Sequence, residues 1–167
     1  MSQRRKKKIC YTRHRRILSR IPMKTPTLLL IATLAASPLF AEAPDFQKDL
    51  QKTVHAATKD SKMAFILLGR AACGNCNATK AMIREGKIPV TADAFVAADL
   101  NIDDQRVQAA FMQKYQKEKF GNTLPFVVIT DSHGKALASS GGYKSPEAWS
   151  ALIEEAKKKI AAKSGAR

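Results

Sequence analysis

The chain has 167 residues, and its hydrophobic share of 45% and charged share of 26% are typical of a soluble globular domain with some additional sequence. A formal net charge of +15 first suggests a nucleic-acid binder, but the excess charge is local. Residues 1–41 contain ten Lys and Arg and no acid, whereas residues 42–167 contain 19 bases and 14 acids. The basicity belongs mainly to the N-terminus, so we expect no nucleic-acid partner.

Residues 23–43 have the pattern of a signal peptide. Lys24 supplies a positive charge, an apolar stretch follows, and small residues then permit cleavage after Ala41 or Ala43. The apolar stretch is short for a membrane span. We therefore predict a periplasmic or secreted protein, membrane-anchored if the segment stays uncleaved, with a folded domain over residues 44–167.

Residues 1–22 form a basic extension ahead of this segment. The sequence favours a true translation start at Met23, but a long export n-region or a basic arm for nucleic acid or acidic lipid stays open. Cys10 lies in the extension and would be lost on processing. The mature chain would then keep only Cys73 and Cys76, and an exported protein that retains one closely spaced pair is expected to use it.

The first predicted elements are a helix and a strand. Phe46, Leu50, Val54 and Ala57 recur at helical spacing, which predicts an amphipathic helix from about Phe46 onward. The apolar run at residues 63–69 then predicts a strand buried on both faces.

A second helix and a second strand follow the cysteine pair. Residues 77–86 have helix-compatible composition with a stop at Gly86, and residues 94–101 resemble a strand. The next helix is expected to start at Asp103 or Asp104 and to end before Gly121. Its apolar face comprises Val107, Phe111 and Tyr115.

The C-terminal part predicts a hairpin and a last helix. The strand at 125–130 begins with proline, which is tolerated there, and a turn at 131–134 leads to a paired strand at 135–142. Ser145 caps a helix with Pro146 at its first position, ending near residues 157–159. That helix is expected to bury Trp149, Leu152, Ile153, Ala156 and Ile160. The alternation of helices and strands predicts an α/β fold with a parallel core and an antiparallel edge.

Cys73 and Cys76 lie where the first strand gives way to a helix. A cysteine at a helix start faces unpaired N–H groups and the positive end of the dipole, which stabilise thiolate over thiol. Its partner three residues later lies one turn along, close enough for a disulfide. This spacing favours Cys73 as the exposed attacking thiolate and Cys76 as the more buried resolving thiol. Gly74 between them leaves room for another protein's backbone, and Asn75 adds no charge.

Other uses of the pair stay open. A zinc site needs about four ligands, and the remaining candidates, His55 and His133, lack zinc-finger spacing. A hydrolase would need a positioned histidine. A purely structural disulfide across so short a loop would add little stability. A binding module with a non-catalytic pair is the main alternative that is not an enzyme.

The motifs resemble those of exported thioredoxin-fold thiol-disulfide oxidoreductases over about residues 45–160. The matching segments are FILLGRAACGNCNATKAM, NTLPFVVITDSHGKAL and GGY. The resemblance implies a thioredoxin-like three-layer sandwich, with a central mixed sheet of about four strands flanked by helices. It also implies a cis peptide between Leu124 and Pro125, in a segment that holds the substrate beside Gly74 and Asn75.

Two positions depart from the pattern of that family. Ala72 stands where members usually carry a tryptophan, and Leu67 stands where thioredoxin has a buried carboxylate. The strand around Leu67 has no acid, so a proton relay for the resolving cysteine is absent or supplied from elsewhere. Three other carboxylates near the site, Asp99, Asp103 and Asp104, are expected to serve strand ends and helix starts.

The sequence thus predicts an exported enzyme that reduces or exchanges disulfides through the Cys73–Cys76 couple, without metal or other cofactor. The expected partners are proteins with thiols or disulfides and a membrane electron donor, and we expect a monomer. The alternative function is a thioredoxin-fold binding or copper-handling module with a non-catalytic CxxC.

Overall fold

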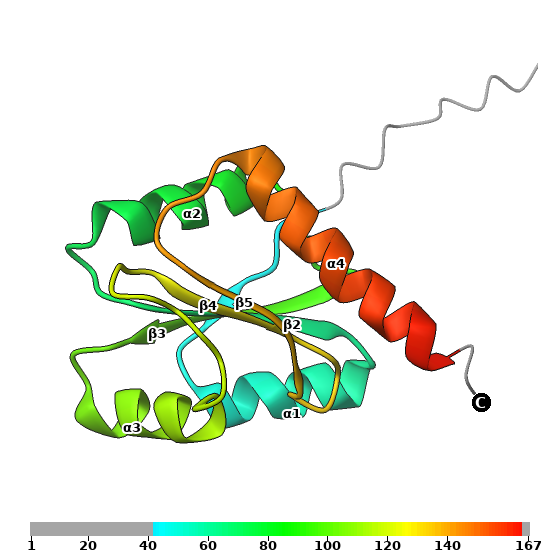
Figure 1. The fold of residues 1–167 in the computed structure, drawn as a ribbon, viewed down its shortest axis with the longest axis horizontal. Helices are drawn as coiled ribbons and strands as arrows, with labels where there is room; N and C mark the ends of the chain where they lie inside the picture. The colour runs from blue at the N-terminus through cyan, green and yellow to red at the C-terminus, as the bar shows by residue number, and fades with distance from the viewer. Residues whose placement is uncertain (1–41, 165–167) are drawn as a thin grey trace, which may run out of the picture. The chain divides into compact units, whose positions relative to one another are not determined.

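A computed structural model describes residues 42–164, so the predicted extension and nearly all of the predicted signal peptide lie outside the described part. Within that part, no helix has the length and apolar character needed to cross a membrane. The elements alternate along the chain and form helical layers on both sides of a sheet (Figure 1). In chain order they are β1 (Phe46–Gln47), α1 (Leu50–Asp60), β2 (Met63–Gly69), α2 (Gly74–Arg84), β3 (Phe95–Asn101), α3 (Gln105–Lys114), β4 (Phe126–Thr130), β5 (Ala136–Gly141) and α4 (Pro146–Ser164).

The sheet has five strands in the order β1-β3-β2-β4-β5. Strand β3 runs parallel to both β1 and β2, whereas β4 is antiparallel to β2 and to β5. The predicted parallel core with an antiparallel hairpin at one edge is therefore confirmed, and the arrangement is thioredoxin-like. The sheet has one strand more than the expected four because β1, a two-residue strand, pairs through Phe46 with Ala97.

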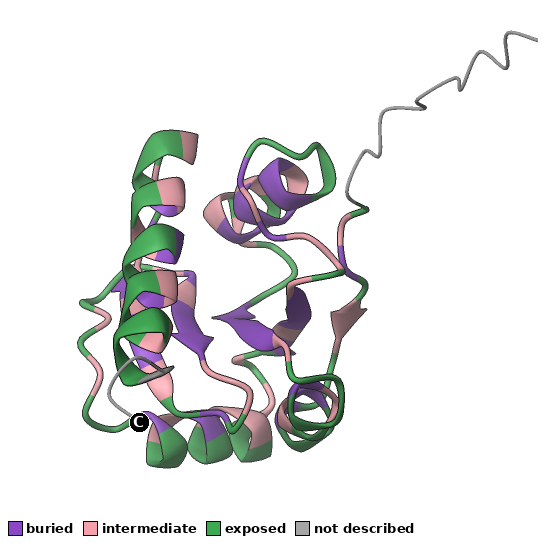
Figure 2. Ribbon diagram, turned by 90° about the vertical axis from the view of Figure 1, so that its right-hand side faces the viewer, coloured by how far each residue is buried: buried purple, intermediate pink, exposed green. Residues whose placement is uncertain are grey.

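Two apolar clusters, one on each face of the sheet, hold the layers together. Because side chains alternate along a strand, Phe65 and Leu67 of β2 face one cluster and Ile66 faces the other. Helices α2 and α4 cover the first face, and α1 and α3 cover the second (Figure 1). Figure 2 shows the buried colour concentrated on the strands and on the inward sides of the helices. The buried, continuous strand predicted at residues 63–69 is confirmed, since all seven residues of β2 are buried.

The first predicted helix begins later than expected. Phe46 belongs to β1 and packs at the edge of the α2–α4 face. The helix starts at Leu50, because the Asp49 side chain caps it by accepting a hydrogen bond from Lys52 N at 2.8 Å. The prediction of a helix from Phe46 onward, which relied on its helical spacing with Leu50, was therefore wrong at its start.

Two other helix ends also differ from the prediction. Asp104 caps α3 as expected, but the helix ends at Lys114 instead of continuing toward Gly121. Phe120 leaves the helical path and stacks on Phe126, with ring centroids 5.3 Å apart. Helix α4 continues to Ser164, past the lysines expected to end it. On its inner face Trp149, Ile153 and Ala156 are buried, whereas Leu152 and Ile160 are only partly buried.

The segment before β4 packs closely on the end of β5. A Cβ added at Gly141 would overlap the carbonyl oxygen of Phe120, with Thr123 O only 3.1 Å away. The obstruction is backbone on both sides, so a side chain there cannot be accommodated by a rotamer change. Gly141 therefore fixes how closely residues 120–125 approach the sheet.

Replacing Gly141 by alanine should destabilise the fold. We expect Gly141→Ala to lower the free energy of unfolding by about 2 kcal/mol, the usual scale of overpacking against a rigid neighbour. Urea denaturation followed by circular dichroism measures the change. Gly74→Ala is the matched control, because a Cβ at Gly74 meets no atom within 4 Å. Equal midpoints for the two variants would contradict the prediction.

Candidate functional site

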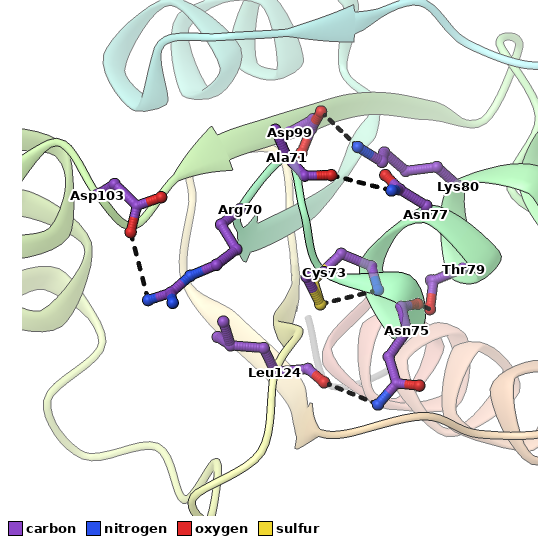
Figure 3. The surroundings of a disulfide bond; sticks show 11 residues. Arg70, Ala71, Cys73, Asn75, Asn77, Thr79, Lys80, Asp99, Asp103 and Leu124 are labelled. Carbon is purple, nitrogen blue, oxygen red and sulfur yellow. Dashed lines mark hydrogen bonds and ion pairs between the residues drawn. A yellow bond between two sulfur atoms is a disulfide. The ribbon is translucent and has the colours of Figure 1, made fainter.

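The two cysteines lie at the N-terminal end of α2, just beyond the end of β2, and are joined by a disulfide. Figure 3 shows the residues around Cys73. Cys73 is the N-cap residue of α2, and its Sγ accepts a hydrogen bond from Cys76 N at 3.1 Å. Cys73 is half-buried, whereas Cys76 is 1% exposed and belongs to the apolar cluster under α2. The structure thus gives the pair the unequal exposure that the sequence predicted.

The sulfur of Cys76 sits against Gly69, the last residue of β2. A Cβ at Gly69 would lie 2.6 Å from Cys76 Sγ and 3.1 Å from the Leu67 side chain. Only glycine leaves enough space for the sulfur at the end of the strand. The close approach of β2 to Cys76 therefore depends on this glycine, and no local sequence pattern reveals the contact.

The segment around Leu124 and Pro125 lies beside the cysteine pair. The peptide between these residues is cis, as the resemblance implied. Asn75 in the first turn of α2 donates a hydrogen bond from Nδ2 to the Leu124 carbonyl oxygen at 3.4 Å (Figure 3). Gly142, the residue after β5, donates from its backbone N–H to Pro125 O at 3.0 Å. Hydrogen bonds thus tie the Leu124–Pro125 segment to the start of α2 and to the residue after β5, and the substrate-binding roles of Gly74, Asn75, Leu124 and Pro125 stay predictions.

A charged group lies under α2 on the other side of the pair. Asp99 of β3 binds Lys80 and Lys48 through the same oxygen, Oδ2, at 2.9 Å and 2.6 Å. The Lys80 side chain is 11% exposed and that of Asp99 16%, so this ion pair is largely buried. Burial raises the pKa of Asp99, but the hydrogen bonds and charges of Lys48 and Lys80 outweigh burial and hold that pKa below its ordinary value.

Asp99, Asp103 and Asp104 were each expected to serve a strand end or a helix start. In the structure the three side chains make different interactions. Asp104 caps α3 by accepting hydrogen bonds from Arg106 N and Val107 N, as expected. Asp103 pairs with Arg70 at 3.3 Å, and both side chains are about half exposed. Asp99 is not simply a strand-end residue, because it is drawn into the ion pair beneath the active-site helix. Its position next to Leu67 depends on strand pairing, which the sequence pattern does not reveal.

The metal-site and hydrolase alternatives can be compared with the side chains of the described residues. Over residues 42–164, no three His, Cys, Asp or Glu side chains gather where they could hold a metal ion. His55 lies on α1, which covers the face of the sheet opposite α2, and His133 lies in the turn between β4 and β5. Neither histidine is placed to activate Cys73 as a nucleophile for hydrolysis.

Comparisons with known proteins find distant similarity among solved structures. Neither a protein-family model nor a curated protein matches the chain. Among solved structures, the oxidoreductase DsbH is 18% identical, covering 75% of this chain and 92% of its own, with a TM-score of 0.49. Oxidised thioredoxin O1 from Arabidopsis thaliana is 15% identical, with coverages of 68% and 97% and a TM-score of 0.48. A disulphide isomerase from Xylella fastidiosa Temecula1 is 17% identical, with coverages of 68% and 87% and a TM-score of 0.41.

The predicted thioredoxin-like arrangement rests on the chain's own strand order, β1-β3-β2-β4-β5, and on the pair of helices that packs on each face of the sheet. The identities are too low to transfer a substrate or a reaction, so function has to be derived from the residues of the site. A thioredoxin-like fold with paired cysteines at the start of α2 supports a thiol-disulfide function in general terms.

The unequal exposure of the two sulfurs predicts selective alkylation of the reduced protein. We expect Cys73 to react with iodoacetamide at least about tenfold faster than Cys76, because it is accessible and its thiolate faces the N–H groups of α2. Peptide mass spectrometry after timed quenching measures each cysteine separately. In guanidinium chloride the two rates should converge. Faster modification of Cys76 in the folded protein would refute the assignment of Cys73 as the attacking thiol.

Proposed function

We propose that this protein is an exported thiol-disulfide oxidoreductase that reduces or exchanges disulfides in protein substrates. The observation that carries the proposal is the disulfide between a half-buried N-cap cysteine and a fully buried cysteine one turn later. A sulfur that must meet a partner protein needs access, and a sulfur that only closes the pair does not. The arrangement therefore suits a two-step exchange better than a structural cross-link.

The chemistry proceeds through a mixed disulfide. In the reduced protein, the Cys73 thiolate attacks one sulfur of a substrate disulfide, the substrate S–S bond breaks, and the second substrate sulfur leaves as a thiolate. Cys76, deprotonated, then attacks Cys73 Sγ, so that the Cys73–Cys76 bond forms and the first substrate sulfur is released. The substrate gains two electrons and the protein is oxidised to the disulfide state present in the structure. The same steps in reverse donate a disulfide.

The surroundings of Cys73 suit a protein substrate. A Cβ at Gly74 would meet nothing within 4 Å, so the space next to Cys73 is open to an approaching backbone. The Leu124–Pro125 segment lies on one side of this space, tied to α2 through Asn75. We propose that an extended substrate segment lies against Leu124 and Pro125 while its sulfur reacts.

The direction of electron flow is proposed from the two residues between the cysteines. The dipeptide between the cysteines, Gly74-Asn75, resembles neither the Gly-Pro of thioredoxin nor the Pro-His of the strong periplasmic oxidant. We favour a reductase or interchange role in the periplasm or outside the cell, with a membrane electron donor to restore the dithiol. We further propose that the protein acts as a monomer.

Serine variants of the two cysteines should fail at different steps. Cys73→Ser removes the attacking sulfur, so reduction of a disulfide-bonded model protein by dithiothreitol should fall to the uncatalysed rate. Cys76→Ser keeps the attack but removes resolution, so a mixed disulfide with the substrate should accumulate on non-reducing gels. Turnover that survives Cys73→Ser would overturn the proposed function.

The reduction potential of the pair decides the direction. Equilibration against a thiol redox buffer should give a value near about −270 mV, as in thioredoxin, if the protein is a reductant. A value near about −120 mV, as in the periplasmic oxidant, would instead make it a disulfide donor. A pair that never equilibrates with the buffer would favour a binding module with a non-catalytic CxxC.

A further inference from the structure

Resolution of the mixed disulfide requires Cys76 to lose a proton in a place that water barely reaches. Only the thiolate attacks a disulfide, and a thiol in apolar surroundings keeps its proton more firmly than one in water. Cys76 is 1% exposed and packs with Leu67 and Ile83. The strand beneath it offers no help, because β2 contains no titratable side chain. The proton acceptor must come from another element.

A cleft connects the neighbourhood of Cys76 with a carboxylate. Its volume is about 590 Å³, and it runs beside α2 along the ends of β2 and β3. Gly69, which abuts Cys76 Sγ, lines this cleft, and so does Asp99. Asp99 is also the pairing partner of Leu67 in the parallel register of β2 and β3, only two residues before the Gly69–Asn101 pair. The carboxylate therefore lies on the α2 side of the sheet, one strand away from the chain that supports Cys76.

Asp99 is the acid of this cleft that is largely buried and lies under α2. The other acid that lines it, Asp104, caps α3 and has a side chain that is 42% exposed, against 16% for Asp99. Asp99 binds both of its lysines through Oδ2, and within residues 42–164 no hydrogen bond is made to its Oδ1. Figure 3 shows Asp99 and Lys80 next to Ala71 and Asn77, at the start of α2. The two ammonium groups keep the carboxylate ionised and thus able to accept a proton.

We infer that Asp99 is the proton acceptor for Cys76 when the mixed disulfide is resolved, an assignment that rests on the function proposed above. The Sγ–H proton of Cys76 passes through water in the cleft to Asp99, and the resulting thiolate attacks Cys73 Sγ. The Cys73–Cys76 bond forms, the bond from Cys73 to the substrate breaks, and the substrate leaves as a thiolate. Asp99 then releases its proton to solvent through the open cleft, beside Lys48. Lys80 and Lys48 are positioning residues, because they fix the carboxylate and its charge.

The expected effect is confined to the second step. General base catalysis contributes about 10²- to 10⁴-fold when the base is well matched to the pH, and less when its own pKa is low. Since Lys48 and Lys80 hold the pKa of Asp99 down, we expect Asp99→Asn to slow resolution about 10- to 100-fold. Attack by Cys73, which does not use this cleft, should keep its rate.

A chromogenic aromatic disulfide separates the two steps. The full chain carrying Cys10→Ser is reduced, desalted and mixed rapidly with 5,5′-dithiobis(2-nitrobenzoate), so that only Cys73 and Cys76 can react. Attack by Cys73 releases the first coloured thiolate, and resolution by Cys76 releases the second. In Asp99→Asn the first phase should be unchanged and the second slower. Asp103→Asn is the matched control, because Asp103 also pairs with a cation near the cysteines but is 56% exposed and outside the cleft lining.

Two further variants guard against a purely structural effect. Asp99→Asn leaves Lys80 buried beside an amide, so the double variant Asp99→Asn/Lys80→Met, which has no unpaired buried charge, should show the same slow second phase. Asp99→Glu should restore most of the rate, because the cleft has room for one more methylene. A normal second phase in either folded variant that lacks the carboxylate overturns the inference. A faster second phase would also overturn the inference, because the negative charge of Asp99 would then only destabilise the Cys76 thiolate.

A failure of the proposed function itself would give a different result in the same experiment. If the Asp99-containing protein releases no first thiolate, or releases both in a single step that is unaffected by Cys76→Ser, then there is no mixed disulfide for Cys76 to resolve. In that case the exchange mechanism itself is wrong, whatever Asp99 does.

Discussion

Strand β2 is buried at all seven residues and is hydrogen-bonded to β3 on one side and to β4 on the other. Its side chains enter both apolar clusters, so the two helical layers are joined through this one strand. Burial of its aliphatic and aromatic side chains contributes about 1.5–3 kcal/mol each. The position of the cysteine pair follows from β2, because only four residues (70–73) separate the end of this strand from the start of α2. A displaced β2 would displace Gly69 and with it the contact to Cys76.

Because β2 is buried on both faces, a charged side chain on this strand would be unfavourable. An ionised group buried on both sides would need partners that the apolar clusters lack. The charges near the site therefore come from elements at its margin, with Lys80 on α2 and Asp99 on β3. Removing two charges from water costs several kcal/mol per ion, and the pair recovers this only through close contact. Lys48, whose side chain is 72% exposed, adds a second cation at the solvent side of the same oxygen.

Sequence patterns predicted the parts of this structure that depend on local physics. The apolar run of β2 and the Asp104 cap are both determined by residues within a few positions of one another. The helix expected from Phe46 failed because β1 exists only through pairing with β3, about fifty residues later. Similarly, α3 stops at Lys114 because Phe120 gains aromatic contacts with Phe111 and Phe126.

Within the candidate site, the cysteine pair and the Leu124–Pro125 segment could be named from sequence, but their surroundings could not. The contact of Gly69 with Cys76, the Asn75–Leu124 hydrogen bond and the Asp99 ion pairs all depend on how separate elements approach. In the sequence, Asp99 cannot be told apart from other acids near strand ends. Only the register of β2 and β3 shows that it lies beside Leu67. Register is a tertiary property, and the alternating pattern of one strand does not fix it.

The hydrogen bond from Asn75 to the Leu124 carbonyl also bears on how readily a partner is released. At 3.4 Å it is long, and it occupies an acceptor that an extended peptide lying along this segment would use. An arriving backbone N–H can replace the Asn75 amide, and the amide can return when the peptide leaves. The acceptor is then satisfied in both states, so docking gains little net hydrogen bonding. If the protein acts on substrate disulfides as proposed, such an exchange would favour brief encounters with many different chains, in which the covalent bond between sulfurs supplies most of the residence time.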